Sequence, residues 1–220
     1  MPQTKLFLLA SNSPRRRDLL SIAGFMFGIA AVDIDETPLP GEDPRDYVQR
    51  LSIGKAQAAH QKTQGKYLIL AADTTVADGV QILGKPRSAG EARQMLEQLR
   101  GRAHQVHTGI TLLDTETGEM IHEIATTNVP MRQYSDAEID AYIASGDPFD
   151  KAGGYGIQNP DFRPVETRTG CYANVVGLPL CHLLRALRRM GVEVKQDVPY
   201  LCQTAHHYEC GVFSTILKDQ

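Results

Sequence analysis

The chain has 220 residues, of which 42% are hydrophobic and 22% are charged. This length suits one large domain or two small ones, and the ordinary composition excludes collagen-like, low-complexity and wholly disordered chains. With 23 Lys and Arg residues against 26 Asp and Glu, the net charge of -3 does not indicate a protein that binds nucleic-acid polymers. Binding of a small anionic ligand is still compatible with this charge, because it needs only a local basic cluster.

No segment of the sequence indicates export or membrane insertion. No run approaches the roughly 18 apolar residues of a membrane helix, and the apolar run Leu6–Ala10 is too short for the core of a signal peptide. Cys171, Cys181, Cys202 and Cys210 all lie in the last quarter of the chain. We therefore expect free thiols, a cytoplasmic location and no membrane partner.

The predicted elements alternate between strand and helix at first, and a hairpin follows in the middle of the chain. They are, in order, a strand at 6–10, a helix from Ser13–Pro14 to Gly24, a helix from Asp43–Pro44, a buried strand at 67–72 that ends at Asp73, a helix capped by Ser88, a hairpin from 103 to about 132, a helix capped by Ser135 and an amphipathic helix at 179–190. This order favours an α/β protein with α+β features, in which helices flank a mixed sheet.

Three arginines, Arg15–Arg17, follow Ser11 and Ser13 at the first predicted helix start. Free N–H groups and a partial positive charge favour a phosphate at that position, and hydroxyls and guanidiniums add charge-assisted hydrogen bonds. Basic residues are unfavourable in a first helical turn, so we expect an anion to bind there. The alternative is a solvated helix start with a good cap. The glycines of a Walker A loop are missing.

Carboxylates form a second group of candidate site residues. Asp33, Asp35 and Glu36 lie close together, and Asp73 follows a buried strand. Open α/β sheets place their ligands at strand ends, and Mg²⁺ is commonly held by one or two carboxylates plus substrate phosphates and water. The alternatives are a surface loop for the first three residues and a helix or turn cap for Asp73.

Three spaced lysines, Lys55, Lys85 and Lys151, can act as point charges on phosphate oxygens. Taken one at a time, each is more often a solvated surface residue. The glycine-rich loop 153–156 could bring backbone close to a flat ligand, or it could be a plain turn.

Residues 191–220 show no clear period, and we expect a tail with one short element. This segment offers four zinc ligands, namely Cys202, His206, His207 and Cys210. Their spacing fits none of the usual zinc patterns, so a weakly packed tail is the favoured interpretation.

Taken together, these motifs resemble the Maf family of nucleoside triphosphate pyrophosphatases. The matching segments, in the order of the family, are 8–16, Asp35-Glu36, Lys55-Ala56, Ala72-Asp73-Thr74, Gly84-Lys85-Pro86, 150–158 and 176–180. Each segment alone is weak, but the ordered set is specific and spans roughly residues 5–190. The resemblance therefore defines a nucleotide pyrophosphatase domain at 1–190 and leaves 191–220 as an appended tail.

The resemblance implies an elongated fold related to that of inosine triphosphatase, with a cleft between two lobes. It also implies hydrolysis of a nucleoside triphosphate to the monophosphate and pyrophosphate, with Mg²⁺ or Mn²⁺ as cofactor, and it leaves a homodimer open. By position, the triphosphate would contact Ser11, Arg15, Arg16, Lys55, Lys85 and Lys151. Glu36 and Asp73 would bind the metal, and Asp73 would orient or deprotonate the water.

The family branch that acts on dTTP and UTP resembles this chain at three places. These are Arg15, Thr74 after the key aspartate, and Gly156-Ile157-Gln158. Thr74 and Gln158 would hydrogen-bond the pyrimidine edge. The branch that acts on 7-methyl-GTP has Trp at the first place and Gln at the second, so the pyrimidine type is favoured.

A nucleotide-binding regulator of septum formation that needs no turnover is the rival function. The retained carboxylates and lysines favour catalysis, because a pure binder needs neither a metal nor a base. The chain departs from the family pattern at 159–169, where two prolines and several charges make a regular strand unfavourable.

Overall fold

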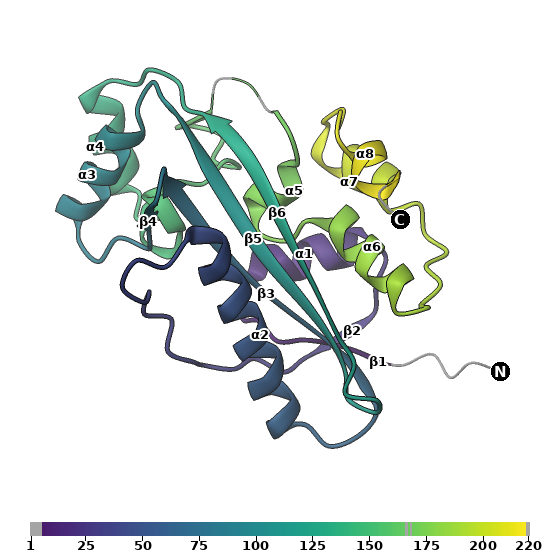
Figure 1. Cartoon of the computed structure of the whole chain (residues 1–220). Coiled ribbons are helices and arrows are strands. Elements are labelled where there is room, and N and C mark those ends of the chain that lie inside the picture. The colour runs from purple at the N-terminus through teal and green to yellow at the C-terminus, as the bar shows by residue number, and fades with distance from the viewer. Residues whose placement is uncertain (1–5, 166, 168, 219–220) are drawn as a thin grey trace.

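The computed structural model describes residues 6–165, 167 and 169–218, and it shows one mixed sheet with helices packed against it (Figure 1). The strands are β1 (Leu6–Leu9), β2 (Phe27–Ile29), β3 (Tyr67–Asp78), β4 (Gln81–Leu83), β5 (Ala103–Asp114) and β6 (Met120–Pro130). Their order is β2-β1-β3-β5-β6, and β4 pairs with the C-terminal end of β3. Because β1 is parallel to β2 and β3 while β3, β5 and β6 are antiparallel, the expected mixed α/β sheet is confirmed.

Several of the helices begin where the sequence provides side-chain caps. They are α1 (Pro14–Ile22), α2 (Pro44–Lys62), α3 (Ala89–Leu99), α4 (Asp136–Ala144), α5 (Tyr172–Val176), α6 (Leu180–Arg189), α7 (Val198–His206) and α8 (Phe213–Lys218), with 3₁₀ turns η1 (Asp147–Asp150) and η2 (Ala152–Gly154). Ser13, Asp43, Ser88 and Ser135 cap α1, α2, α3 and α4 by accepting backbone N–H groups, as predicted. No helix in the described ranges is long and apolar enough to cross a membrane.

Alternating side chains of β3 separate two packing layers. Leu68 and Leu70 belong to a core cluster with residues of α1 and α6, whereas Ile69 and Ala71 pack with residues of α2. Successive side chains of a strand point to opposite faces, so this alternation places α2 on one face and α1 with α6 on the other. The same alternation continues into the residues that follow Ala72.

The two 12-residue strands β3 and β5 are long enough to reach a second hydrophobic cluster. Val76 and Val106 pack there with Leu96 of α3 and Tyr142 of α4. Figure 1 shows α3 and α4 at one end of these strands and α6 to α8 toward the other. The chain therefore has the elongated, two-lobed form that we expected.

Asp73 does not end its strand, and that part of the sequence prediction is wrong. β3 runs on to Asp78, and Asp73 pairs with Gly109 of β5. The apolar run stops at Ala72, but ladder pairing with β5 keeps the polar residues that follow in strand conformation. Only glycine fits at position 109 for a steric reason, because a Cβ atom there would lie 2.5 Å from the backbone oxygen of Val48 in α2.

Residues 191–218 form two helices, and the expectation of a tail with one short element is wrong. Val198 of α7 is only 1% exposed and belongs to the core cluster of α1 and α6. Arg185 of α6 donates to the backbone oxygen of Ile216 at 3.0 Å, and the Tyr208 hydroxyl donates to that of Gly170 at 3.0 Å. The helices are short, so their packing side gives little periodicity in the sequence.

All four cysteines are free, and they line one small cavity of about 20 Å³ beside α5, α6 and α7. Burial raises the pKa of Cys171 and of Cys181 to about 12, and that of Cys202 to about 11. These three thiols are therefore uncharged packing groups at neutral pH. Within the described residues, no group of three or more His, Cys, Asp or Glu side chains is placed to hold a metal ion.

The packing of α7 predicts a specific loss of stability. Val198→Ala should lower the free energy of unfolding by about 1–3 kcal/mol, because it removes buried methyl groups from the shared core. Tyr200→Ala is the matched control, since Tyr200 lies on the same helix but is 62% exposed. Urea unfolding measures both variants, and equal stability losses would contradict the assigned packing.

A buried histidine predicts a dependence of stability on pH. Burial lowers the pKa of His104, whose Nε2 lies 2.7 Å from the Tyr155 hydroxyl, to about 4. The unfolded chain takes up this proton below about pH 6.5, whereas the folded chain takes it up only near pH 4. Stability should therefore fall as the pH drops through that window.

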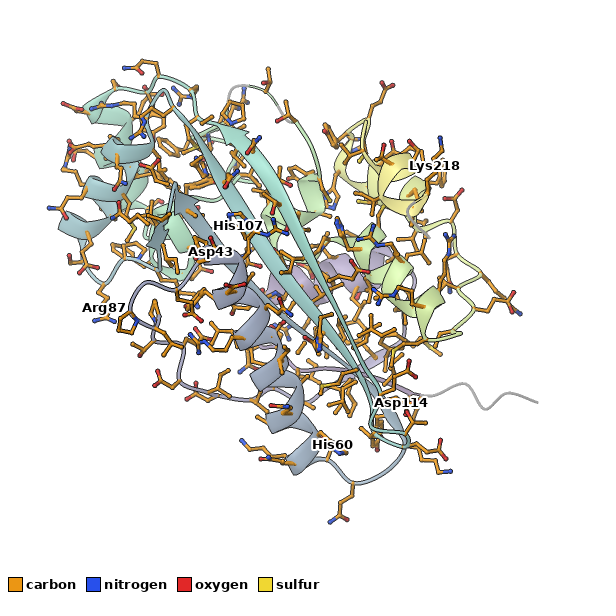
Figure 2. The ribbon with its side chains drawn as sticks, viewed as in Figure 1. Asp43, His60, Arg87, His107, Asp114 and Lys218 are labelled. Carbon is orange, nitrogen blue, oxygen red and sulfur yellow. The ribbon has the colours of Figure 1, made fainter. Side chains whose placement is uncertain are left out.

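His104→Phe should reduce this pH-dependent loss, as measured by urea unfolding at about pH 7 and about pH 5. His60→Asn is the control, because His60 is an exposed residue near the C-terminal end of α2 (Figure 2). If His104→Phe loses as much stability on acidification as the unaltered chain, His104 is not a source of the dependence.

Candidate active site

A cleft of about 1200 Å³ opens between the two lobes, and all ten of the predicted site residues line it. These are Ser11, Arg15, Arg16, Glu36, Lys55, Asp73, Thr74, Lys85, Lys151 and Gln158. Asp33 and Asp35 are not among the lining residues, and Asp35 instead accepts a hydrogen bond from the backbone of Thr37 at 2.9 Å. The fold thus brings together side chains that are up to 147 positions apart in the sequence.

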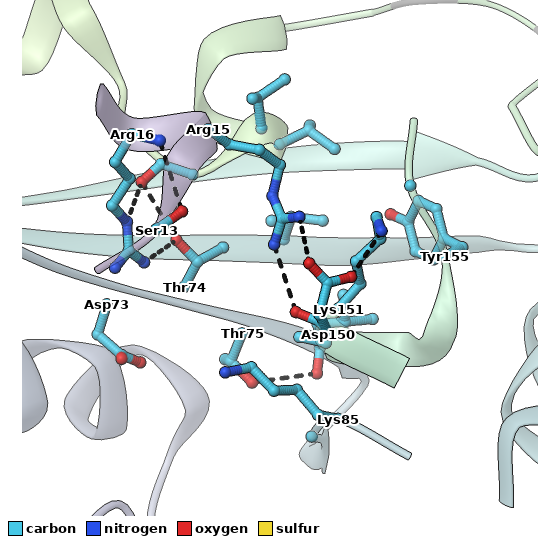
Figure 3. A pocket seen from close by; sticks show the side chains of 18 of the residues that line it. Ser13, Arg15, Arg16, Asp73, Thr74, Thr75, Lys85, Asp150, Lys151 and Tyr155 are labelled. Atoms are coloured by element: carbon cyan, nitrogen blue, oxygen red, sulfur yellow. Dashed lines mark hydrogen bonds and ion pairs between the residues drawn. The ribbon is translucent and has the colours of Figure 1, made fainter. Parts of the chain in front are cut away.

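The start of α1 holds Arg16 in a fixed position (Figure 3). Arg16 donates from Nε to the backbone oxygen of Gly177 at 2.8 Å, from Nη2 to Thr74 Oγ1 at 3.0 Å, and from Nη1 to Ser11 Oγ at 3.2 Å. Burial lowers the pKa of Arg16, and the charge of Asp73 opposes that effect. A half-buried guanidinium with three oriented contacts is pre-arranged to meet an anion.

Arg15 links α1 to the opposite wall of the cleft. Its Nη1 pairs with Asp150 Oδ2 at 2.8 Å, and its Nη2 donates to the Asp150 backbone oxygen at 3.3 Å. Asp150 also accepts from Lys151 Nζ at 2.6 Å, and Asp147 accepts from the same ammonium at 2.7 and 2.8 Å. Each of the cations Arg15 and Lys151 therefore has a carboxylate partner in this structure.

No role was predicted for Asp147 or Asp150 from the sequence. Asp150 lies in the matched segment 150–158, whereas the only signal for Asp147 is its position four residues before Lys151, and such spacing is common on protein surfaces. The Lys85 segment approaches this loop because the Gly153 N–H donates to the Gly84 backbone oxygen at 3.0 Å. Gly153 has a positive φ of 69°, and a Cβ atom there would lie 2.9 Å from the Val76 side chain.

Glu36 and Asp73 meet at the ammonium of Lys55. Lys55 Nζ lies 2.5 Å from Glu36 Oε1 and 2.6 Å from Asp73 Oδ1. Burial raises the pKa of Asp73, although Lys55 and Arg16 oppose that effect. Burial acts in the same direction on Glu36, but the hydrogen bond and charge of Lys55 more than offset it, so the pKa of Glu36 is lowered.

These two carboxylates have the chemistry of a site for a hard divalent cation. Their oxygens converge on one positive centre, Lys55 Nζ, from two different segments of the chain. Mg²⁺ requires six oxygen ligands and commonly takes one or two from carboxylates and the rest from phosphates and water. Glu36 and Asp73 therefore fit a cation that arrives together with a phosphate ligand.

Lys85 and Gln158 line the cleft without a hydrogen bond or ion pair to any other residue that the structure describes. The charge of Lys85 contributes to the lowered pKa of Glu36, so Lys85 acts on the carboxylate side of the cleft. Both side chains are available to a ligand without first leaving a partner.

The atypical segment after Gln158 is anchored by aromatic packing. Phe162 is 5% exposed and stacks on Tyr142 with ring centroids 4.2 Å apart. Asn159 Oδ1 accepts the backbone N–H of Phe162 at 2.8 Å. Val165 makes an isolated bridge with Met131, and the described part of 159–169 contains no named strand, in line with the prediction. Residues 166 and 168 lie outside the described residues.

Comparison with known proteins gives a family for this arrangement. The family model described as Maf-like protein matches residues 6–190. The chain belongs to the Maf family. A dTTP/UTP pyrophosphatase from Citrifermentans bemidjiense is 47% identical to this Maf chain over 184 residues, which cover 84% of this chain and 95% of that relative. A dTTP/UTP pyrophosphatase from Geobacter sulfurreducens is 44% identical over 184 residues, with coverage of 84% and 96%.

Solved structures give more distant similarities to this Maf chain. A HAM1 protein from Coxiella burnetii aligns with a TM-score of 0.43 and 19% identity, over 60% of this chain and 75% of that one. A nucleoside-triphosphatase, or dITP/XTP pyrophosphatase, from Mycobacterium abscessus aligns with a TM-score of 0.41 and 15% identity, over 84% and 97%.

Proposed function

We propose that this Maf chain is a nucleoside triphosphate pyrophosphatase that hydrolyses dTTP and UTP to the monophosphate and pyrophosphate. One observation carries the proposal. Arginines and lysines line the same cleft as two carboxylates, and both carboxylates contact the Lys55 ammonium. Relatives named dTTP/UTP pyrophosphatase, 44% and 47% identical over most of this chain, support the same substrate class.

The cationic residues bind the triphosphate in this proposal. The start of α1 and the guanidinium of Arg16 line one wall of the cleft, and Lys85 and Lys151 line the other. Charge-assisted hydrogen bonds to phosphate oxygens are stronger than neutral ones and fix the orientation of the ligand. Lys151 would exchange one of its carboxylate contacts for a phosphate oxygen, since all three of its hydrogen bonds go to Asp147 and Asp150.

Glu36 and Asp73 would hold the divalent cation, Mg²⁺ or Mn²⁺. When it is bound, this cation offsets negative charge on the phosphate oxygens at the reacting end. Lys55 lies between the two carboxylates and keeps them within reach of the same point.

Asp73 accepts the proton of the attacking water. Asp73 is a buried carboxylate that lines the cleft, and a carboxylate in reach of a water can accept its proton as a general base. As the proton moves to the Asp73 carboxylate, the water oxygen bonds to the α-phosphorus. The bond from that phosphorus to the bridging oxygen of the β-phosphate breaks, and pyrophosphate leaves.

Thr74 and Gln158 select the pyrimidine in this proposal, and both line the cleft beside the phosphate grip. A site whose polar groups are satisfied by one base discriminates against bases that leave them unpaired.

The free thiols fit an enzyme of the cytoplasm. A homodimer stays a prediction, which sedimentation experiments can test.

A substrate panel tests this function. With Mg²⁺ present, release of pyrophosphate should be faster from dTTP and UTP than from purine nucleoside triphosphates, and removal of the metal with EDTA should abolish it. Faster hydrolysis of 7-methyl-GTP than of either pyrimidine nucleotide would contradict the substrate assignment. Binding of nucleotides with no hydrolysis of any of them would favour the regulator of septum formation.

Asp73→Asn tests the role of the base. This change keeps the size of the side chain but removes its charge, so turnover at saturating substrate and metal should fall by at least about 10²–10⁴-fold. Nucleotide binding through the arginines should persist, which equilibrium titration can measure. Asp35→Asn is the matched control, because Asp35 does not line the cleft. Retention of more than about a tenth of the rate would exclude Asp73 as the base.

A further inference from the structure

Behind Arg16, a chain of hydrogen bonds leads away from the cleft into the core. We infer that Thr108 of β5 and Asn174 of α5 are positioning residues, which hold Thr74 and the Arg16 guanidinium in the orientation that grips the substrate. The inference rests on the proposed function, because it concerns the same cleft. Neither Thr108 nor Asn174 lines that cleft.

The hydrogen-bond distances connect these residues without a gap. Arg16 Nη2 donates to Thr74 Oγ1 at 3.0 Å, and Thr74 Oγ1 lies 2.9 Å from Thr108 Oγ1. Thr108 Oγ1 in turn donates to the backbone oxygen of Asn174 at 3.2 Å. Thr74 and Thr108 are ladder partners on β3 and β5, so the sheet itself sets their separation.

The two ends of this chain and its distances favour one direction for its hydrogens. A guanidinium can only donate and a backbone oxygen can only accept, while each hydroxyl has a single hydrogen. Because the Thr108 hydroxyl donates to Asn174, its oxygen can accept the Thr74 hydrogen at 2.9 Å, a shorter contact than the 3.4 Å from Thr74 Oγ1 to the Gly177 oxygen. With this order, the Thr74 oxygen is free to accept the hydrogen bond from Arg16 Nη2.

Asn174 anchors the inner end of the chain. Its side chain is fully buried, and Nδ2 donates to the backbone oxygen of Val106 at 3.0 Å and to Thr127 Oγ1 at 2.9 Å. These contacts tie α5 to both β5 and β6. Because α5 has only five residues, its position depends on such contacts more than on its own helical hydrogen bonds.

The same short helix supplies the second contact of Arg16. The backbone oxygen of Gly177, which follows α5, accepts from Arg16 Nε at 2.8 Å and lies 3.4 Å from Thr74 Oγ1. If Thr108 lost its hydroxyl, the Thr74 hydrogen would turn to Gly177 and compete with Arg16 for that oxygen. Loss of one buried hydroxyl would thereby loosen two of the three contacts of the guanidinium, those with Thr74 and Gly177.

Three variants separate this role from ordinary packing. Thr108→Val keeps the shape of the side chain and removes the hydroxyl, whereas Thr108→Ser retains the hydroxyl. Thr111→Val is the matched control, because Thr111 lies on the same strand and is also fully buried. Its hydroxyl contacts Ser52 and His122, neither of which lines the cleft.

We expect Thr108→Val to lower kcat/KM for UTP by about tenfold, the size of effect that an unsatisfied buried hydrogen-bonding group produces. Thr111→Val should lose a similar amount of thermal stability and keep its kcat/KM, and Thr108→Ser should restore most of the activity. The inference is overturned if Thr108→Val retains full activity, or if Thr111→Val loses as much activity as Thr108→Val.

A double-mutant cycle tests the route through Thr74. In a Thr74→Val background, Thr108→Val should cause little further loss, because the contact that it acts through is already gone. Independent, additive losses would contradict the inference.

A measurement that needs no turnover separates this inference from the proposed function. The Arg16 Nε–H should exchange with solvent faster in Thr108→Val than in Thr111→Val, as followed by NMR of the arginine side chains. If the unaltered chain hydrolyses no nucleoside triphosphate, the proposed function fails, and this exchange rate still decides the positioning role. Equal exchange in the two variants would overturn it.

Discussion

The alternation of side chains along β3 is the constraint on which the candidate site depends. Odd positions of this strand face α2 and even positions face α1 and α6, so two consecutive polar residues reach different partners. Asp73 meets Lys55 of α2, and Thr74 meets Arg16 of α1. The sheet thus separates the candidate metal-binding carboxylate from the candidate phosphate-binding arginine by one residue of backbone, and a shift of register by one would exchange the faces on which their partners lie.

The charges of the site are fixed by close packing at a distance from the cleft. Lys55 can reach Asp73 only because α2 lies close against β5, and that approach depends on the missing side chain of Gly109. A buried carboxylate and a buried ammonium each lose hydration, and their mutual contact compensates for part of that loss. The burial that raises the pKa of Asp73 is therefore a product of the same packing that brings its partner to it.

Local signals in the sequence were enough for the helix caps and for the arginines that follow Ser13. They failed at Asp73, because the continuation of β3 depends on pairing with β5, a strand more than 30 positions further along the chain. Contacts between the cleft walls, such as Arg15 with Asp150, have no local pattern at all. The resemblance to the ordered motifs of the family identified site residues in separate segments of the chain. The motifs do this without describing the tertiary contacts that bring those residues together.

The pairing of Arg15, Lys55 and Lys151 with carboxylates means that much of the cleft is internally neutralised before any ligand enters. An anion that approaches these groups does not meet bare positive charge, and it has to displace carboxylates from their cations. In the proposed function, a divalent cation held by Glu36 and Asp73 would leave the Lys55 ammonium available to a phosphate oxygen. Metal and nucleotide would then favour each other's binding, and because such coupling is reciprocal, the cleft would discriminate against either one arriving alone.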